Sequence, residues 1–421
     1  MSAVPLRQII KEYIGGGWGK EAPDRDHVVP ASVIRGTDLD AVQSGITGSV
    51  PYRWHKASNA RSRTLKPGDI VFEVSGGSKD QPVGRSLLLD ATRLAQFQTA
   101  VIPASFCKKI SPDQNKVHAR FLMAHLQLAW SDRRIVQWQV QSTGISNFNF
   151  EAFLDDFLID LPPLSIQQRI AGILSAYDEL IENSQRRIKI LESMARALYR
   201  EWFVHFRFPG HESVPRVPSP LGEIPKGWEV KKLATVAEVN RAQINARTAP
   251  EELHYIDISS VSPGQIDSTT AYAFADAPGR ARRIVQHGDV LWSCVRPNRR
   301  SHAQVMHPEP HTIASTGFAV LTATKVPFTF LYFATTTDAF VAFLTNNATG
   351  AAYPAVSGAT FEKADLLIPP APLLKKFGDA TIPMAVQIHA LHRKIQNLRR
   401  TRDLLLPRLL SGQIDLEAIA S

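Results

Sequence analysis

The sequence has only two cysteines, Cys107 and Cys294, which lie in different halves of the chain and form no CxxC pair. A disulfide framework or a thiolate zinc site is therefore not expected, and a reducing cytoplasm is the expected location. No apolar run approaches the roughly eighteen residues that a membrane span requires, so we expect no membrane partner. The first residues lack the basic start and apolar stretch of a signal peptide.

Motifs that carry chemistry are also missing. The glycine-rich segment 15–20 has the wrong spacing for a phosphate loop, with Glu21 where Ser or Thr is required, and we interpret it as a flexible turn. Asp69 and Glu73 come closest to the carboxylates of a metal nuclease, but Ser75 stands in place of the required Lys. The thirteen histidines are scattered along the chain, so a zinc site is not expected. We therefore expect a non-catalytic chain with no metal and no cofactor of its own.

The composition is that of an ordinary globular protein with an excess of positive charge. Hydrophobic residues make up 44% and charged residues 21% of the 421 residues, a length that suits two or three domains. The net charge is +9. Basic proteins of this size often bind polyanions, and in the cytoplasm the usual polyanion is nucleic acid.

Three landmarks occur twice in the chain. A Pro-Pro pair ends at Pro163 and again at Pro370, an offset of 207 (370 − 163). Thr-Gly pairs at 143–144 and 349–350 are offset by 206 (349 − 143), and Gly-Asp pairs at 68–69 and 288–289 by 220 (288 − 68). A period of about 200 residues is far longer than the roughly 20–50 residues of a solenoid repeat. Two whole domains are therefore predicted to be duplicated.

Each duplicated half is predicted to have mixed α/β structure and to be followed by a long helix. Short β-rich runs and one helix at 119–139 are expected in the first half. The predicted organisation is a first domain at 1–162, a long helix at 163–206, a second domain at 207–370 and a second long helix at 371–421. Pro383 is expected to mark a kink or a late start of the last helix.

The two long helices show heptad spacing, with apolar residues at alternating steps of three and four. Each has one apolar seam, and we expect the two seams to pack on each other, although each helix could instead pack on its own half. The residues predicted at this helix-pair interface are Ile173, Tyr177, Leu180, Leu191, Leu198, Ile388, Leu391, Ile395, Leu398 and Leu405.

Equivalent basic loops follow the two Gly-Asp strands, and the Thr-Gly segments bring further polar and aromatic groups. Arg can bind guanine and Asn adenine in the major groove, while Lys neutralises phosphate. Solvent-exposed turns with charged tips are the alternative interpretation, and the Thr-Gly segments could simply seat the chain before the long helix. The candidate DNA-binding residues are Ser75, Lys79, Arg85, Asn147, Arg296, Asn298, Arg299, Arg300, His302 and Tyr353.

Four stretches together resemble the specificity subunit of type I restriction–modification systems. They are Gly227–Leu233 at the start of the second half, Leu161–Ile170 and Ala197–Phe206 at the ends of the first long helix, and Leu406–Asp415 near the end of the chain. The resemblance covers essentially the full length. The N-terminal half lacks a clear counterpart of Gly227-Trp228-Glu229, which leaves its opening boundary undefined.

The resemblance implies two target-recognition domains held apart by an antiparallel pair of coiled-coil helices. Each domain would read one half of a split double-stranded DNA sequence, and the helices would fix the gap. Methylation subunits with S-adenosylmethionine, and restriction and translocation subunits with ATP and Mg, would supply the chemistry. Two alternatives remain: the specificity subunit of a type II-like system with a fused nuclease and methyltransferase, and a coiled-coil scaffold that binds no DNA.

Overall fold

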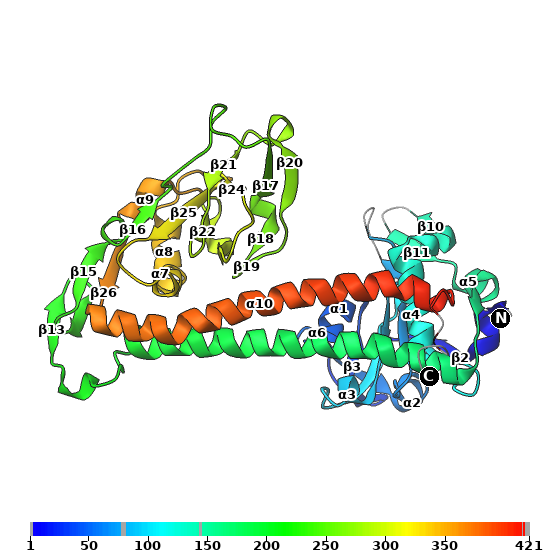
Figure 1. The fold of residues 1–421 in the computed structure, drawn as a ribbon. Helices are drawn as coiled ribbons and strands as arrows, with labels where there is room; N and C mark the ends of the chain where they lie inside the picture. Colours follow the sequence, from blue (N-terminus) through cyan, green and yellow to red (C-terminus); the bar gives the residue numbers. More distant parts are fainter. Residues whose placement is uncertain (1–2, 77–80, 143–144, 415, 417–421) are drawn as a thin grey trace. The chain divides into compact units, whose positions relative to one another are not determined.

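The computed structural model describes residues 3–76, 81–142, 145–414 and 416 (Figure 1). Two compact units form: unit 1 comprises residues 1–183 with 394–421, and unit 2 comprises residues 184–393. Lys79 and the Thr143-Gly144 pair, which the sequence singles out, lie outside the described residues.

Unit 1 has a four-stranded antiparallel sheet as its centre. Its order is β2-β9-β5-β7, and a second sheet of order β4-β3-β8 pairs β3 and β8 in parallel. The central strands are apolar and fully buried, as in Ile70, Val71 and Phe72 of β5. The strands are β1 (Ala3–Pro5), β2 (Ile10–Gly15), β3 (His27–Ile34), β4 (Tyr52–Lys56), β5 (Ile70–Glu73), β6 (Ser75–Gly76), β7 (Ser86–Leu88), β8 (Ala100–Pro103), β9 (Cys107–Pro112), β10 (Gln139–Ser142), β11 (Ile145–Phe148) and β12 (Leu158–Asp160).

The short helices of unit 1 are α1 (Leu39–Gln43), α2 (Ala57–Arg63), α3 (Ala91–Leu94), α4 (Ala119–Ser131) and α5 (Phe150–Asp156). The predicted helix at 119–139 is thus wrong in its second half. The α-helix ends at Ser131, and Arg133 has a left-handed φ of 65° that breaks it before a 3-10 helix at Arg134–Trp138. Apolar spacing alone does not reveal this break, because Ile135 and Trp138 continue the pattern and are buried.

Unit 2 repeats this design. A sheet of order β16-β25-β22-β23 corresponds to the central sheet of unit 1, and a second sheet of order β20-β17-β24-β21 again has one parallel pair, β17 with β24. The strands are β13 (Arg216–Ser219), β14 (Gly222–Pro225), β15 (Glu229–Lys232), β16 (Ala237–Val239), β17 (Glu252–Ile256), β18 (Val261–Ser262), β19 (Gln265–Ile266), β20 (Thr270–Ala273), β21 (Ala281–Ile284), β22 (Val290–Ser293), β23 (His302–Gln304), β24 (Thr312–Ser315), β25 (Phe318–Ala323) and β26 (Asp365–Ile368). The helices are α7 (Phe328–Thr335), α8 (Asp338–Asn346) and α9 (Gly358–Glu362).

The two Gly-Asp pairs build the same turn in both units. Gly68 and Gly288 have left-handed φ values of 95° and 89°, a conformation that glycine adopts without steric cost. The Asp69 carboxylate accepts a hydrogen bond from the backbone N–H of Lys66 at 2.7 Å, and Asp289 accepts one from Gln286 at 2.8 Å. Each buried carboxylate therefore closes the turn that leads into the central strand, and burial raises the pKa of Asp289.

The opening strand of the N-terminal half has a counterpart that the sequence does not reveal. Strand β1 pairs with β12 antiparallel, just as β15 pairs with β26. The backbone N–H of Leu6 then donates to the Phe157 carbonyl at 2.9 Å, and that of Leu233 donates to the Ala364 carbonyl at 2.8 Å. The first domain thus opens at β1 without a Gly-Trp-Glu sequence, because the strand pairing needs only backbone groups.

Two long helices contribute to the units: α6 (Leu164–Tyr199, 36 residues) and α10 (Ala371–Leu410, 40 residues). Within unit 1, Ile170 and Leu174 of α6 share a core cluster with Leu409 and Leu410 of α10. Within unit 2, Leu198 and Tyr199 pack on a cluster that includes Leu373, Leu374 and Phe377. Of the two outcomes expected at Pro383, the late helix start is wrong, because α10 begins at Ala371, and the kink stays a prediction.

The apolar seam of α10 follows the predicted register, with Leu391 and Ile395 buried and Ile388, Leu398 and Leu405 half-buried. In α6, at every second predicted position, the buried residue lies one position after the residue that the heptad spacing predicts. Leu180 is 45% exposed while Ile181 is 6% exposed, and Ile188 and Ala195 are buried in the same way. Ile173, Tyr177, Leu191 and Leu198 are half-buried. The choice of Leu180 is corrected to Ile181, and the apolar Ile188 after the charged Arg187 is the sequence signal that favours this register.

Within the described residues, no single helix is long and apolar enough to cross a membrane. Helices α7 and α8 are long and apolar enough only when taken together, and the chain bends by 61° between them. Their residues Phe330, Leu331, Phe340 and Leu344 are part of the hydrophobic core of unit 2.

Candidate nucleic-acid interface

The predicted DNA-binding loops follow the last residues of an inner strand of the central sheet in each unit. The edge of the sheet formed by these strand ends is the one described below. Because β5 and β9 are antiparallel, the end of β5 at Glu73 lies opposite the start of β9 at Cys107. In unit 2, the end of β22 at Ser293 likewise lies opposite the start of β25 at Phe318. The segments that follow β5 and β22 therefore occupy equivalent places.

The Thr-Gly segments come back to this same edge. The backbone N–H of Phe148 donates to the Val74 carbonyl at 2.9 Å, and that of Val356 donates to the Cys294 carbonyl at 2.9 Å. In both units, the residue just after the central strand is thus bonded to the segment that follows the Thr-Gly pair. In each half of the sequence the Gly-Asp strand precedes the Thr-Gly segment, and these backbone hydrogen bonds bring the two together in space.

In unit 1 the pairing joins two of the predicted residues. Ser75 of β6 is opposite Asn147 of β11, and the Ser75 hydroxyl donates to Asn147 Oδ1 at 2.9 Å. Asn147 is exposed. Since its oxygen is occupied by Ser75, its Nδ2 group keeps two N–H donors for an outside acceptor.

Arg85 is a structural residue rather than a DNA-binding one. Its side chain is 12% exposed and donates to both carboxylate oxygens of Glu73, at 3.0 and 2.8 Å, and to the Gly36 carbonyl at 2.7 Å. The buried Glu73 requires this charge, because a lone carboxylate in the core would be costly. The prediction that Arg85 contacts DNA is therefore wrong, because Glu73 binds its guanidinium group inside unit 1.

In unit 2 the corresponding loop is held by Arg296 and Tyr353. The Arg296 guanidinium lies 4.6 Å from the centre of the Tyr353 ring and donates to the Ala352 carbonyl at 3.2 Å. The backbone N–H of Arg296 donates to the Pro354 carbonyl at 2.7 Å. Arg296 has a left-handed φ of 50°, which these contacts stabilise. Tyr353 remains 69% exposed, so the pair presents an aromatic ring and a cation at the surface.

The tip of this loop carries Asn298 and Arg299, which are both exposed. A 3-10 turn at Pro297–Arg299 supports them, with Pro297 buried at its start. Arg299 has no ion-pair partner within the part of the chain that the structure describes. Arg300 forms an ion pair with Asp338 at the start of α8. Asn298 and Arg299 are therefore the residues of the loop most available to a ligand.

His302 is not part of this surface. It is 6% exposed in β23, and its ring lies 4.8 Å from that of Trp292 and 5.6 Å from that of Tyr332. Burial lowers the pKa of His302 to about 4, with smaller effects from Arg196 and Arg300. His302 is thus a neutral core residue at physiological pH, and its assignment to DNA binding is wrong. Alternation along β23 turns its side chain inward, which the position after a basic loop does not reveal.

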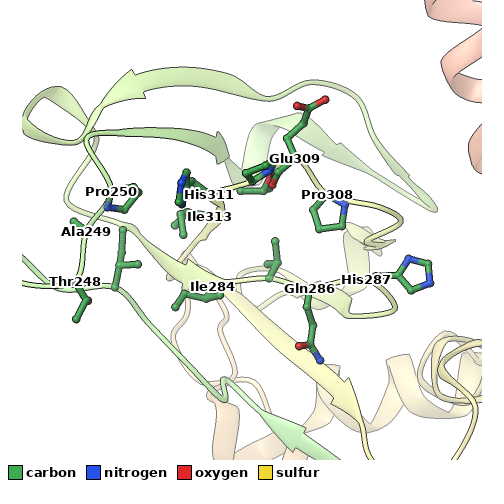
Figure 2. Close-up of a pocket in the computed structure, with 14 residues that line it drawn as sticks. Thr248, Ala249, Pro250, Ile284, Gln286, His287, Pro308, Glu309, His311 and Ile313 are labelled. Atoms are coloured by element: carbon green, nitrogen blue, oxygen red, sulfur yellow. The ribbon is translucent and has the colours of Figure 1, made fainter.

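A shallow cleft of about 520 Å³ lies on the second sheet of unit 2 (Figure 2). Figure 2 shows the side chains of three segments around it, at residues 248–250, 284–287 and 308–313. Its lining is dominated by isoleucines and prolines, with His287, His311 and Glu309 as the ionisable groups. This cleft involves β21 and β24, whereas the predicted DNA-binding residues of unit 2, apart from His302, lie in the loops after β22 and before α9. Among the described residues, no three His, Cys, Asp or Glu side chains are placed to hold a metal ion.

Comparison with known proteins gives a consistent result. The sequence profile of the type I restriction modification DNA specificity domain matches residues 63–193. The type I restriction enzyme MjaIX specificity subunit of Methanocaldococcus jannaschii is 24% identical over 271 residues, which are 63% of this chain and 62% of that protein. The MjaVIII specificity subunit of the same organism is 29% identical over 163 residues, 38% of this chain and 37% of that protein.

A solved structure adds the fold. The S subunit of a type I restriction–modification system from M. genitalium superposes with a TM-score of 0.61 at 14% identity, over 97% of this chain and 95% of that one. In sequence the chain is similar to type I restriction enzyme specificity subunits, and in fold it is similar to the S subunit from M. genitalium. The sequence match to the first relative spans less than two thirds of that relative's length. The duplicated α/β units and the two long helices agree with this similarity.

Proposed function

We propose that this chain is the DNA-reading subunit of a type I restriction–modification complex. Unit 1 and unit 2 would each read one half of a split double-stranded target. One observation carries this proposal: the exposed polar residues predicted from the sequence emerge from the same edge of the same sheet in both units. A duplicated surface suits a target made of two separate halves.

The groups at these edges match the chemistry of base edges and phosphates. The free N–H donors of Asn147 and Asn298 suit purine acceptors in the major groove. Arg299 and Arg296 supply positive charge for phosphate or guanine, in agreement with the net charge of +9. Ser75 orients Asn147 through its hydrogen bond, and Tyr353 orients Arg296 through the contact between ring and guanidinium.

The long helices would set the length of the unread gap. At 1.5 Å per residue, the 36 residues of α6 extend for about 54 Å, more than the roughly 34 Å of one turn of B-DNA. A helix pair transmits both distance and rotation, which a flexible linker would not. Inserting one heptad into both α6 and α10 adds about 10 Å, so we expect the gap to grow by about three base pairs while both half-sites stay the same. A change of bases within a half-site, at unchanged spacing, would contradict this role.

Partner subunits would dock on the helices and supply the catalysis. Ile190 and Met194 of α6 are 52% and 50% exposed, which leaves apolar surface available to methylation subunits. Those subunits would bind S-adenosylmethionine, and separate restriction and translocation subunits would use ATP and Mg. The chain itself would act as a non-catalytic adaptor that directs both activities to its target.

The deciding experiment maps N6-methyladenine in DNA from cells that produce this chain with its cognate methylation subunit. We expect a new methylated motif with two short defined halves around a fixed gap. A stably assembled complex that leaves no such motif would refute the proposal. The type II-like alternative predicts the same motif but a fused nuclease and methyltransferase as the co-purifying partner.

A coiled-coil scaffold without DNA binding is the alternative from another class. A salt titration separates it from the proposal, because each phosphate contact releases counterions and makes binding weaken steeply as salt rises. A complex that binds no duplex at low salt would favour the scaffold.

A further inference from the structure

One large aromatic side chain at the sheet edge of unit 1 lies outside the two loops assigned above. Phe106 occupies the turn between β8 and β9, and it is 60% exposed. Burying a phenylalanine ring is favourable, so a partner that covers this exposed ring would gain binding free energy. Phe106 belongs to none of the hydrophobic clusters that the described residues form.

The backbone around Phe106 is tightly fixed. The N–H of Cys107 donates to the Ala104 carbonyl at 2.8 Å and closes the turn, and the N–H of Ala104 donates to the Ile34 carbonyl at 2.8 Å. The N–H of Gly16 donates to the Cys107 carbonyl at 2.9 Å. An exposed ring on a fixed backbone loses little conformational freedom when it binds, which is the usual character of an anchor residue.

This turn is bonded directly to the proposed reading segment. The backbone N–H of Val74 donates to the Phe106 carbonyl at 2.9 Å, and the Val74 carbonyl accepts from Phe148 at 2.9 Å. Val74 immediately precedes Ser75, whose hydroxyl donates to Asn147. Phe106 is thus one backbone hydrogen bond away from the strand that carries the Ser75–Asn147 pair.

Unit 2 places its exposed ring on a different loop of the same edge. There the N–H of Cys294 donates to the Gly317 carbonyl at 2.8 Å, so Gly317 takes the place of Phe106. A Cβ atom at Gly317 would lie 2.1 Å from Ile258 Cδ1, so the Ile258 side chain occupies the space where a side chain would begin. The large exposed ring of this edge is instead Tyr353. The backbone frame is common to both copies and the aromatic residue is not, as expected for a residue that determines what each copy reads.

We propose that Phe106 contacts the 5-methyl group of a thymine in the half-site read by unit 1. This inference rests on the proposed function. The donors of the neighbouring Asn147 suit purine acceptors in the major groove, and the thymine methyl group projects into that same groove. An apolar ring on the turn that is hydrogen-bonded to the Ser75–Asn147 segment would therefore favour A·T pairs over pairs that lack the methyl group.

The test uses the full chain assembled with its methylation subunit and the duplex that this complex methylates. Affinities are measured by fluorescence anisotropy for the wild type, for Phe106→Ala, and for Leu158→Ala as a control. Leu158 is 56% exposed in β12 of the same unit. Each protein is also measured on duplexes in which single thymines of either half-site are replaced by deoxyuridine, which lacks only the methyl group.

We expect Phe106→Ala to lower the affinity about 10-fold, because the substitution removes the apolar contact with the thymine methyl group. The salt dependence should stay unchanged, because a ring releases no counterions. Deoxyuridine at one position of the unit 1 half-site should lower wild-type affinity to a similar extent and have little further effect on Phe106→Ala. Leu158→Ala should bind as the wild type does.

Equal binding by Phe106→Ala and wild type would overturn the inference while leaving the proposed function intact. Additive effects of the substitution and of deoxyuridine at every thymine would also overturn it, because the two changes would then remove different contacts. A wild-type complex that prefers no duplex sequence would instead refute the proposed function, and this inference with it.

Discussion

Replacing Asp178 tests how unit 1 holds both long helices against its core. Asp178 of α6 accepts a hydrogen bond from Arg120 of α4 at 2.8 Å and another from Arg402 of α10 at 2.7 Å. The three side chains are between 20% and 28% exposed. One carboxylate thus joins three helices that are far apart in the sequence.

The expected magnitude follows from these contacts. A hydrogen bond to a charged group contributes about 1.5–3 kcal/mol, and partial exposure lowers this through solvent screening. Asp178→Asn weakens both bonds and leaves two guanidinium groups without their carboxylate, so we expect a loss of about 2 kcal/mol in the local stability of unit 1. This corresponds to a roughly 30-fold rise in the population of locally opened states.

Hydrogen exchange of amides in α4 and in residues 394–410 is the suitable assay, because a chain with two units need not unfold in a single transition. Asp403→Asn is the matched control, since Asp403 also binds Arg402 but is 61% exposed. We expect the control to change exchange by less than about 0.5 kcal/mol. An equally small effect of Asp178→Asn would refute the reasoning, as would a double-mutant cycle with Arg402→Gln that gives no coupling.

Three further outcomes are expected. Ile181→Ala should destabilise unit 1 by about 2–4 kcal/mol, whereas Leu180→Ala should cost less than about 1 kcal/mol; the reverse order in hydrogen exchange would restore the register predicted from the sequence. The pKa of His302 falls from 6.5 to about 4 on folding, so unfolded unit 2 binds more protons than folded unit 2 between these pH values. The contribution of His302 to the stability of unit 2 is therefore greatest above pH 6.5 and falls by about 3 kcal/mol toward pH 4. His302→Phe should flatten this part of the pH–stability curve measured by urea unfolding, and an unchanged slope would exclude His302 as its source. Arg299→Ala should weaken DNA binding similarly on all sequences and reduce the salt slope by about one, as measured by anisotropy; an unchanged slope would mean that Arg299 does not contact phosphate.

Much of the candidate site could be placed from the sequence, but the roles of single residues could not. The Gly-Asp and Thr-Gly landmarks correctly indicate two equivalent segments, because turns and strand entries depend on local residue types. Arg85 and His302 occupy these segments and yet face inward, the first toward Glu73 and the second toward Trp292. Their orientation depends on strand register and on a buried partner, which lie beyond local sequence.

Phe106 illustrates the opposite case. A phenylalanine in a mostly apolar stretch is expected in the core, and nothing local distinguishes it from Phe72, which is fully buried. The turn between β8 and β9, and the bond from Val74 across the sheet, turn its ring to solvent. Exposure of this kind depends on which strands become neighbours.

The sequence by itself determined the duplication, the two long helices and the family resemblance that the order of the motifs carries. These features arise from periodicity and from turn residues, which act over a few positions and can be read along the chain. Only the tertiary structure decided the buried row of α6, the opening strand β1 and the inward or outward direction of each candidate side chain. Those features depend on burial against segments that are up to hundreds of residues away in the sequence. The two possible registers of α6 differ by only one residue, and the surface that packs against the helix selects between them.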